Sequence, residues 1–172
     1  MVLFLAIPQA SLADTAAEIN RDVDNALNKL YQTTPAAVKL AKVAKGILVF
    51  PGIIKGGFII GGQYGEGALR VNGRTSGYYR TLAASYGLQA GAQSFGYALF
   101  FLSGADLQYL NKSNGWEIGV GPTIVVVDEG LARSFSTTTG QSGVYAFFFN
   151  QKGLMAGLSI QGSKITRIYP DR

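Results

Sequence analysis

The chain of 172 residues contains no cysteine and no histidine. Without cysteine, disulfide frameworks, iron–sulfur clusters and thiolate zinc sites are excluded. Without histidine, a Ser-His-Asp or Cys-His catalytic unit and a histidine pH switch are excluded as well. Charged residues are also scarce, at 15% against about 25% in an average domain. The remaining chemistry rests on ten carboxylates, fifteen basic groups and the hydroxyls, so we expect no enzyme and no cofactor.

The composition is typical of one β-rich domain. Its length suits a single domain, and its 23 glycines are about twice the usual share. The low charge and the many aromatic residues exclude a disordered chain. Such a composition fits strands that are interrupted by glycine.

The N-terminus resembles the end of an export signal. Ser11-Leu12-Ala13 places small residues at the −3 and −1 positions of a cleavage before Asp14. We interpret residues 1–13 as a signal-peptide remnant and residues 14–172 as the domain. The protein is then expected to be exported, either periplasmic or peripherally attached to the cell envelope. The alternative is an ordinary apolar segment that packs on the domain.

The first predicted helix covers residues 14–31. Thr15 and Glu18 have the spacing of a capping box, in which two free amides at the helix start are satisfied at once. One stripe about 100° wide collects the apolar side chains of the segment. We expect this stripe to pack on the core rather than on a membrane. Its members are Ala16, Ile19, Val23, Ala26, Leu27 and Leu30.

The second predicted helix covers residues 35–45. Thr34 suits its N-cap, Pro35 its first position and Gly46 its C-terminal stop. Three lysines share one side, and the other side is expected to hold Ala36, Ala37, Leu40, Val43 and Ala44. Such a helix either lies on anionic lipid or covers a sheet with its lysines in water.

From Ile47 onward the pattern changes to short β-branched and aromatic runs separated by glycine. Ser103 to Lys112 is the one expected helical insert. Because the strands follow one another without long helices between them, we predict a strongly coiled antiparallel sheet, barrel-like or sandwich-like. The fold class is therefore α+β, mainly β, with two N-terminal helices. The expected strands are residues 47–50, 57–64, 68–71, 78–86, 89–102, 116–127, 133–138, 144–150, 154–161 and 165–169.

Several motifs resemble functional sites without meeting their requirements. The glycine-rich residues 61–67 lack both the Walker lysine and a following helix. Residues 83–87 are one residue short of a hydrolase nucleophile elbow. No ligand spacing supports a metal site, so none is expected from Asp106, Glu117, Asp128 and Glu129. Interleaved aromatic residues are expected to fill the core, namely Tyr78, Tyr79, Tyr86, Phe95 and Tyr97.

Positive charge is concentrated in one window. Eight basic residues lie between Lys29 and Arg80, and only Glu66 opposes them. Such a field suits an anionic surface, although a merely solubilising face is the simpler alternative. Our candidates for lipid-binding residues are Lys39, Lys42, Lys45, Lys55, Arg70 and Arg74. We expect an anionic phospholipid or membrane surface as the partner, and no nucleic acid.

Several segments in order resemble the SYLF domain family. They read AKGILVFP from Ala44, KGGF from Lys55, GGQYGEG from Gly61, ASYGLQAGAQ from Ala84 and GLMAGLSIQG from Gly153. The resemblance spans about residues 19–168 and implies a phospholipid-binding module. Eukaryotic members recognise phosphoinositides, and the yeast-type members also bind actin. Bacterial members are typically bare, exported or lipoprotein-like domains.

These observations together predict a non-enzymatic phospholipid-binding or membrane-binding domain of the bacterial envelope. The chain has no SH3 or zinc-finger partner domain, and its export remnant argues against a role in actin regulation. In such an envelope, phosphatidylglycerol or cardiolipin replaces phosphoinositides as the available anionic lipid. The alternatives are a structural or protein-interaction module of the envelope, or an actin-regulatory adaptor if the source is eukaryotic.

Overall fold

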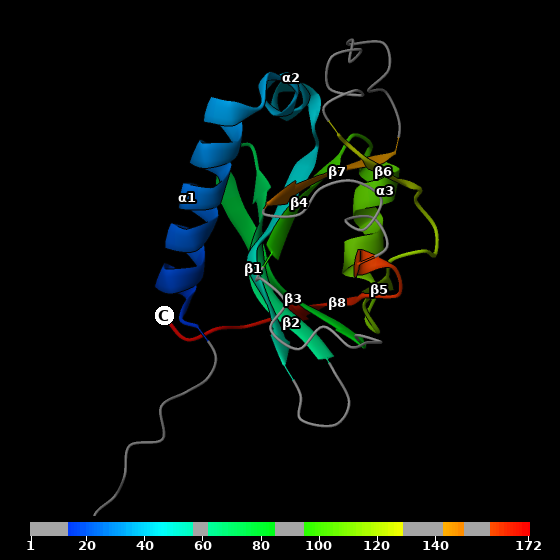
Figure 1. Ribbon diagram of the computed structural model, residues 1–172. Coiled ribbons are helices and arrows are strands. Elements are labelled where there is room, and N and C mark those ends of the chain that lie inside the picture. The colour runs from blue at the N-terminus through cyan, green and yellow to red at the C-terminus, as the bar shows by residue number, and fades with distance from the viewer. Residues whose placement is uncertain (1–13, 57–61, 85–94, 129–142, 150–158) are drawn as a thin grey trace, which may run out of the picture.

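Two N-terminal helices precede a curled sheet, as Figure 1 shows. The structure is a computed structural model that describes residues 14–56, 62–84, 95–128, 143–149 and 159–172. In these residues the sheet has eight strands and curls into a half-barrel. The predicted class, α+β and mainly β with two N-terminal helices, is confirmed.

Helix α1 (Ala16–Thr33) begins at the predicted capping box. The Thr15 amide donates to Glu18 Oε2 at 2.9 Å, and the Glu18 amide donates to Thr15 Oγ1 at 3.3 Å. The predicted apolar stripe faces the sheet, where its larger members Ile19, Val23, Leu27 and Leu30 are buried. The prediction that α1 packs on the core is therefore confirmed.

Helix α2 (Pro35–Val43) starts with proline after Thr34, as expected. The predicted stop at Gly46 is wrong, because Gly46 is already the first residue of strand β1 (Gly46–Gly56). The chain leaves the helix earlier, at Ala44, in an extended conformation, and the Lys45 amide donates to the carbonyl of Phe101 at 2.7 Å. Pairing with a distant strand thus ends the helix before glycine is reached.

The sheet has the strand order β5-β8-β3-β2-β1-β4-β7-β6. All neighbouring pairs are antiparallel except β6 and β7, which are parallel. The expectation of a wholly antiparallel sheet is therefore wrong at this edge. The remaining strands are β2 (Gly62–Val71), β3 (Arg74–Ala84), β4 (Phe95–Phe101), β5 (Trp116–Glu117), β6 (Ile124–Val126), β7 (Val144–Phe149) and β8 (Lys164–Ile168).

Strand boundaries differ from the predictions in several places. The strands predicted at 57–64 and 68–71 form, where described, the single strand β2, and β3 begins at Arg74 rather than at Tyr78. β1 does not end at Phe50 but continues through Pro51 to Gly56. The run from Trp116 to Val127 is not one strand: it forms the short strands β5 and β6 with turns between them. Gly119 and Gly121 adopt positive φ angles of 112° and 82° there, which an extended strand cannot accommodate.

Asn72 and Gly73 have φ angles of 53° and 75° in the β2–β3 turn, as a type I′ hairpin requires. The expected insert after β4 forms helix α3 (Gly104–Leu107) and the 3-10 helix η1 (Gln108–Asn111). Other predictions lie outside the described residues. They are the signal remnant at 1–13, the strand at 133–138 and residues 154–158 of the strand at 154–161. The rest of that last strand is predicted wrongly, because Ser159 and Ile160 are helical and Gln161 is in a turn.

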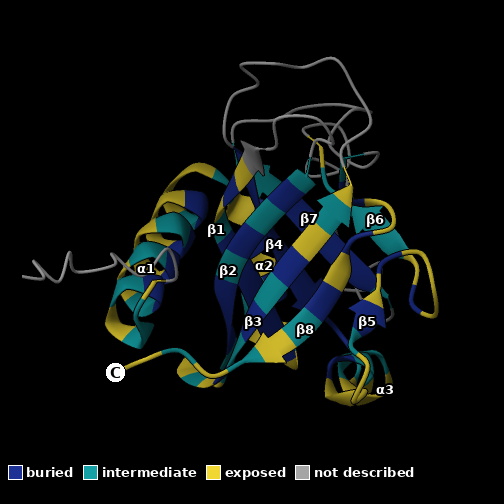
Figure 2. Cartoon of the chain, turned by 90° about the horizontal axis from the view of Figure 1, so that it is seen from below, coloured by how far each residue is buried: buried dark blue, intermediate teal, exposed yellow. Residues whose placement is uncertain are grey.

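Two apolar clusters lie on opposite faces of the sheet. Ile47, Val49 and Phe100 pack with the buried stripe of α1. Leu48 and Phe50, which alternate with them along β1, belong to the second cluster with Trp116 on the other face. Strand β4 is buried along its whole length because it contributes to both. Figure 2 shows this burial and places α1 outside the curl of the sheet.

Candidate functional site

The outer face of α2 gathers basic side chains. Lys39 and Lys42 on α2, and Lys45 two residues after its end, are exposed, while Ala36, Ala37 and Leu40 on the opposite side of the helix are buried. The helix therefore covers the core and presents its lysines to solvent. Residues 25–65 contain five lysines and no aspartate or glutamate, so no acidic residue of this stretch opposes the charge.

Val43 lies on the same side as these lysines. We expected Val43 on the buried face, and that expectation is wrong, because 48% of its surface is exposed. At 100° per residue, Val43 is only about 40° from Lys39 around the helix axis. We call Lys39, Lys42, Val43 and Lys45 the lysine face. Helical geometry alone would have revealed this position.

Arg74 adjoins the same end of the sheet. It is exposed and follows the β2–β3 turn. Ile47, two residues after Lys45, pairs with Arg70 just before that turn. The lysine face and Arg74 therefore belong to one end of the molecule, the end at which Figure 1 shows α2.

Of the other two predicted lipid-binding residues, Arg70 is at the same end but mostly covered, and Lys55 is far away. Arg70 Nη1 donates to Asp24 Oδ1 at 2.7 Å, and only 14% of the Arg70 side chain is exposed. Lys55 pairs with Gln63, eight residues along β1 from Ile47, which corresponds to roughly 25 Å of strand. The six predicted residues thus do not form one contiguous surface.

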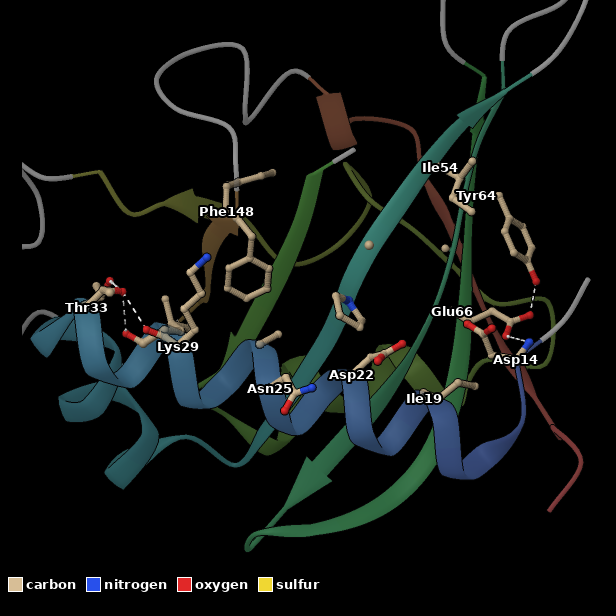
Figure 3. A pocket seen from close by; sticks show the side chains of 17 residues that line it. Asp14, Ile19, Asp22, Asn25, Lys29, Thr33, Ile54, Tyr64, Glu66 and Phe148 are labelled. Atoms are coloured by element: carbon tan, nitrogen blue, oxygen red, sulfur yellow. Dashed lines mark hydrogen bonds between the residues drawn. The ribbon is translucent and has the colours of Figure 1, made fainter. Parts of the chain in front are cut away.

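A groove lies between α1 and residues of strands β1, β2 and β7. It has a volume of about 740 Å³, within the ~300–1,000 Å³ typical of small-molecule sites. Ile54, Phe148 and Phe149 line it from the sheet. Figure 3 shows Asp22, Asn25 and Lys29 projecting from α1 along its rim. Sequence reasoning missed this groove, because its walls come from segments more than a hundred residues apart.

Glu66 organises one end of the groove. Its carboxylate accepts hydrogen bonds from the Tyr64 hydroxyl and, at 3.1 Å, from the Asp14 amide. Burial, together with the hydrogen bond to Glu66 and its charge, raises the pKa of Tyr64 to about 12. Burial and the nearby carboxylates of Glu66, Glu18 and Asp22 raise the pKa of Asp14. This end therefore carries concentrated negative charge.

The sequence motifs that resemble functional sites form ordinary parts of the fold wherever they lie within the described residues. Residues 62–67 of the glycine-rich segment are part of strand β2, not of a phosphate loop. Tyr79, Phe95 and Tyr97 are buried, as expected of core aromatics. Tyr78 is half-buried and bonded to Asn20, and Tyr86 lies outside the described residues. Across the described ranges, no group of three or more acidic side chains is placed to hold a metal ion.

Comparisons with known proteins add no relative. No protein-family model matches the chain, and a search of curated proteins finds no similar sequence. The resemblance to SYLF domains thus rests on the segments quoted above. Among the helices of the described residues, none is long and apolar enough to span a membrane.

Proposed function

We propose that this protein is a non-enzymatic domain that binds anionic phospholipid surfaces of the bacterial envelope through its lysine face. The observation that carries the proposal is that Lys39, Lys42 and Lys45 are exposed together with the apolar Val43. Exposed cations beside an exposed apolar side chain suit a membrane interface, which has phosphates outside and hydrocarbon beneath. The SYLF-like segments support the same class of ligand.

The expected strength of binding follows from the number of charges. A lysine near an anionic membrane contributes about 1 kcal/mol, so three contribute about 3 kcal/mol, or roughly 100-fold in affinity. Arg74 at the same end adds to this attraction. Because the attraction decays within a Debye length of about 8 Å at physiological salt, binding should be sensitive to salt.

The test is co-sedimentation with phosphatidylglycerol vesicles. The triple change Lys39→Glu, Lys42→Glu and Lys45→Glu lowers the formal net charge from +5 to −1. We expect it to reduce binding by at least about 100-fold without altering the circular dichroism spectrum. The matched control carries the same charge change at three exposed residues elsewhere, Arg21→Glu, Lys112→Glu and Lys164→Glu. It should retain most of the binding.

Equal losses in the two triple variants would show that only net charge matters, and the lysine face would be rejected as the site. Binding that persists in about 0.5 M salt, where the Debye length is only a few Å, would reject the electrostatic mechanism. Survival of binding in the first variant would reject the lysine face and place the lipid contact elsewhere, for example at the groove beside α1.

The groove favours a second candidate, a carrier that encloses a single lipid chain. Its walls combine Ile54, Phe148 and Phe149 with the small side chain of Ala26 on α1. The change Ala26→Trp would fill this space. If the protein is a carrier, this variant loses uptake of a fluorescent fatty acid from solution while the triple lysine variant retains it. Under the membrane-surface proposal, Ala26→Trp leaves vesicle sedimentation unchanged.

A further inference from the structure

The backbone nitrogen of Asp14 occupies a specific position. Asp14 immediately precedes the capping box of α1, and its amide donates to Glu66 Oε2 on β2 at 3.1 Å. Glu66 is itself oriented by the hydroxyl of Tyr64, its neighbour but one on the strand. Figure 3 shows Asp14, Glu66 and Tyr64 joined by these two hydrogen bonds. A carboxylate therefore contacts the backbone nitrogen that lies just before the capping box of α1.

The sequence points independently to the same nitrogen. Ser11-Leu12-Ala13 places the expected cleavage between Ala13 and Asp14. Hydrolysis of that peptide bond by an export-linked peptidase consumes one water. It leaves a carboxylate on Ala13 and an α-ammonium group on Asp14. The atom that carries this new charge is the one that already contacts Glu66.

We propose that Asp14 is the first residue of the mature protein and that its α-ammonium group forms an ion pair with Glu66, which fastens α1 to β2. Maturation would then strengthen a contact between the start of the first helix and the middle of the sheet. The role of Glu66 is to position the N-terminus, and this inference does not depend on lipid binding.

The electrostatic surroundings favour a cation at this position. On α1 the facing groups are the carboxylates of Glu18 and Asp22, opposed by Arg21. On the sheet they are Glu66 and Arg80, its partner in the β2–β3 register. The C-terminal segment contributes the carbonyl of Asp171, which accepts from the Ala16 amide at 2.7 Å. With the side chain of Asp14 itself, four carboxylates face two cations, and an α-ammonium group reduces this excess.

The ion pair has a defined pH dependence. A free α-amino group has a pKa of about 7.7–8.0, and pairing with Glu66 should raise that pKa in the folded state. A group whose pKa is raised on folding stabilises the fold fully below its unfolded pKa. The contribution is lost as pH rises through the folded pKa. The mature chain should therefore gain thermal stability at pH 6.5 and lose that gain by about pH 10.

The experiment compares two chains released from a cleavable fusion. One begins at Asp14, and the other begins at Ala13, where the Asp14 nitrogen remains an uncharged amide. We expect a higher melting temperature for the chain that begins at Asp14 at pH 6.5, and equal values near pH 10. The α-amino pKa, followed by NMR, should lie above 8 in the Asp14 chain and return to about 8 in Glu66→Gln.

Identical pH profiles for the two chains would overturn the proposal, as would an α-amino pKa that Glu66→Gln does not change. If Glu66→Gln fails to fold, the comparison of the two starting residues decides the ion pair alone. The cleavage is tested separately by the intact mass of the protein recovered from its own cells. A first residue other than Asp14 would overturn that half of the inference.

Discussion

Arg70 ties strand β2 to helix α1 through a single guanidinium group. Besides the contact with Asp24, its Nη2 atom donates to the carbonyl of Asn20 at 3.3 Å. Thr75 donates to the side chain of the same Asn20 at 2.8 Å. A cation with so little exposure gains its hydrogen bonds from the protein rather than from water. We therefore expect Arg70 to act as a structural cation rather than as part of the proposed lipid-binding surface.

The change Arg70→Met tests this assignment. Because hydrogen bonds to charged groups contribute about 1.5–3 kcal/mol, we expect the free energy of unfolding in urea to fall by about that amount. Vesicle binding should remain within twofold of the unmodified protein. The matched variant Arg74→Met alters an exposed residue, so it should leave stability within about 0.5 kcal/mol and weaken binding. The opposite pattern would return Arg70 to the binding surface.

The ionisation of the Tyr64 hydroxyl can be followed directly as the pH is raised. Burial and the contact with Glu66 raise its pKa to about 12, against about 10 in an unfolded chain. The raised pKa keeps the phenol protonated in the fold, so its contribution to stability is complete below pH 10 and is lost as pH rises through about 12. An NMR titration should show this shifted tyrosine, and Tyr64→Phe should remove its signal.

The change Glu66→Gln removes the negative charge beside that hydroxyl and should move the pKa of Tyr64 back toward 10. Tyr79, whose pKa is raised by burial without a contribution from Glu66, is the internal control and should not respond. A pKa of Tyr64 that stays near 12 in this variant would mean that burial alone causes the shift.

At the scale of elements, α1 is held by its apolar stripe. Leu27 is only 7% exposed and belongs to the cluster beneath the helices. Leu27→Ala should lower the free energy of unfolding by about 2–5 kcal/mol, the usual range for a core leucine. Asn28→Ala, on the exposed side of the same turn, should change it by less than about 0.5 kcal/mol. A variant at Leu27 that melts normally but no longer binds vesicles would make α1 a membrane element.

The helices were predictable because their signals are local. Thr15 and Glu18 lie within one turn of each other, and the stripe of α1 repeats at helical spacing. Strand ends are less predictable because they depend on partners far along the chain. The local sequence predicts a helix stop at Gly46, yet Gly46 pairs with Phe101 in the sheet. The same limit applied to the candidate site. The exposure of Lys39 followed from helix geometry, whereas the pairing of Arg70 with Asp24 and the groove required the three-dimensional fold.

At the scale of the whole molecule, opposite charges are separated along α1. The carboxylates near Asp14 surround its first residue, and the lysine face follows its last. Eighteen helical residues correspond to about 27 Å at 1.5 Å per residue. Under the proposed function, a molecule with this layout would turn its α2 end toward an anionic membrane and its carboxylates away. The proposed N-terminal ion pair would then lie on the side away from the lipid.

The curl of the sheet depends on an irregularity at its centre. The β1 register shifts against β2 between Val49 and Ile54, and against β4 between Phe50 and Ile53. Pro51 lies within this shift, the kind of place where a central strand tolerates proline. The neighbouring strands approach closely there. A Cβ atom on Gly96 of β4 would lie 2.5 Å from the carbonyl oxygen of Pro51.

Gly67 of β2 approaches β1 from the edge opposite to Gly96. Its substitution gives the most direct test of how closely the strands of the curled sheet pack. A Cβ atom there would lie 1.9 Å from the carbonyl oxygen of Val49, and backbone cannot move aside as a flexible side chain would. Gly67→Ala should therefore cost about 3 kcal/mol, the upper end of the usual range for overpacking. Gly52→Ala is the control, since a Cβ atom there meets nothing within 4 Å, and its midpoint in urea should stay close to that of the unmodified protein. Equal midpoints for the two variants would show that β1 and β2 are not packed as closely as the curl requires.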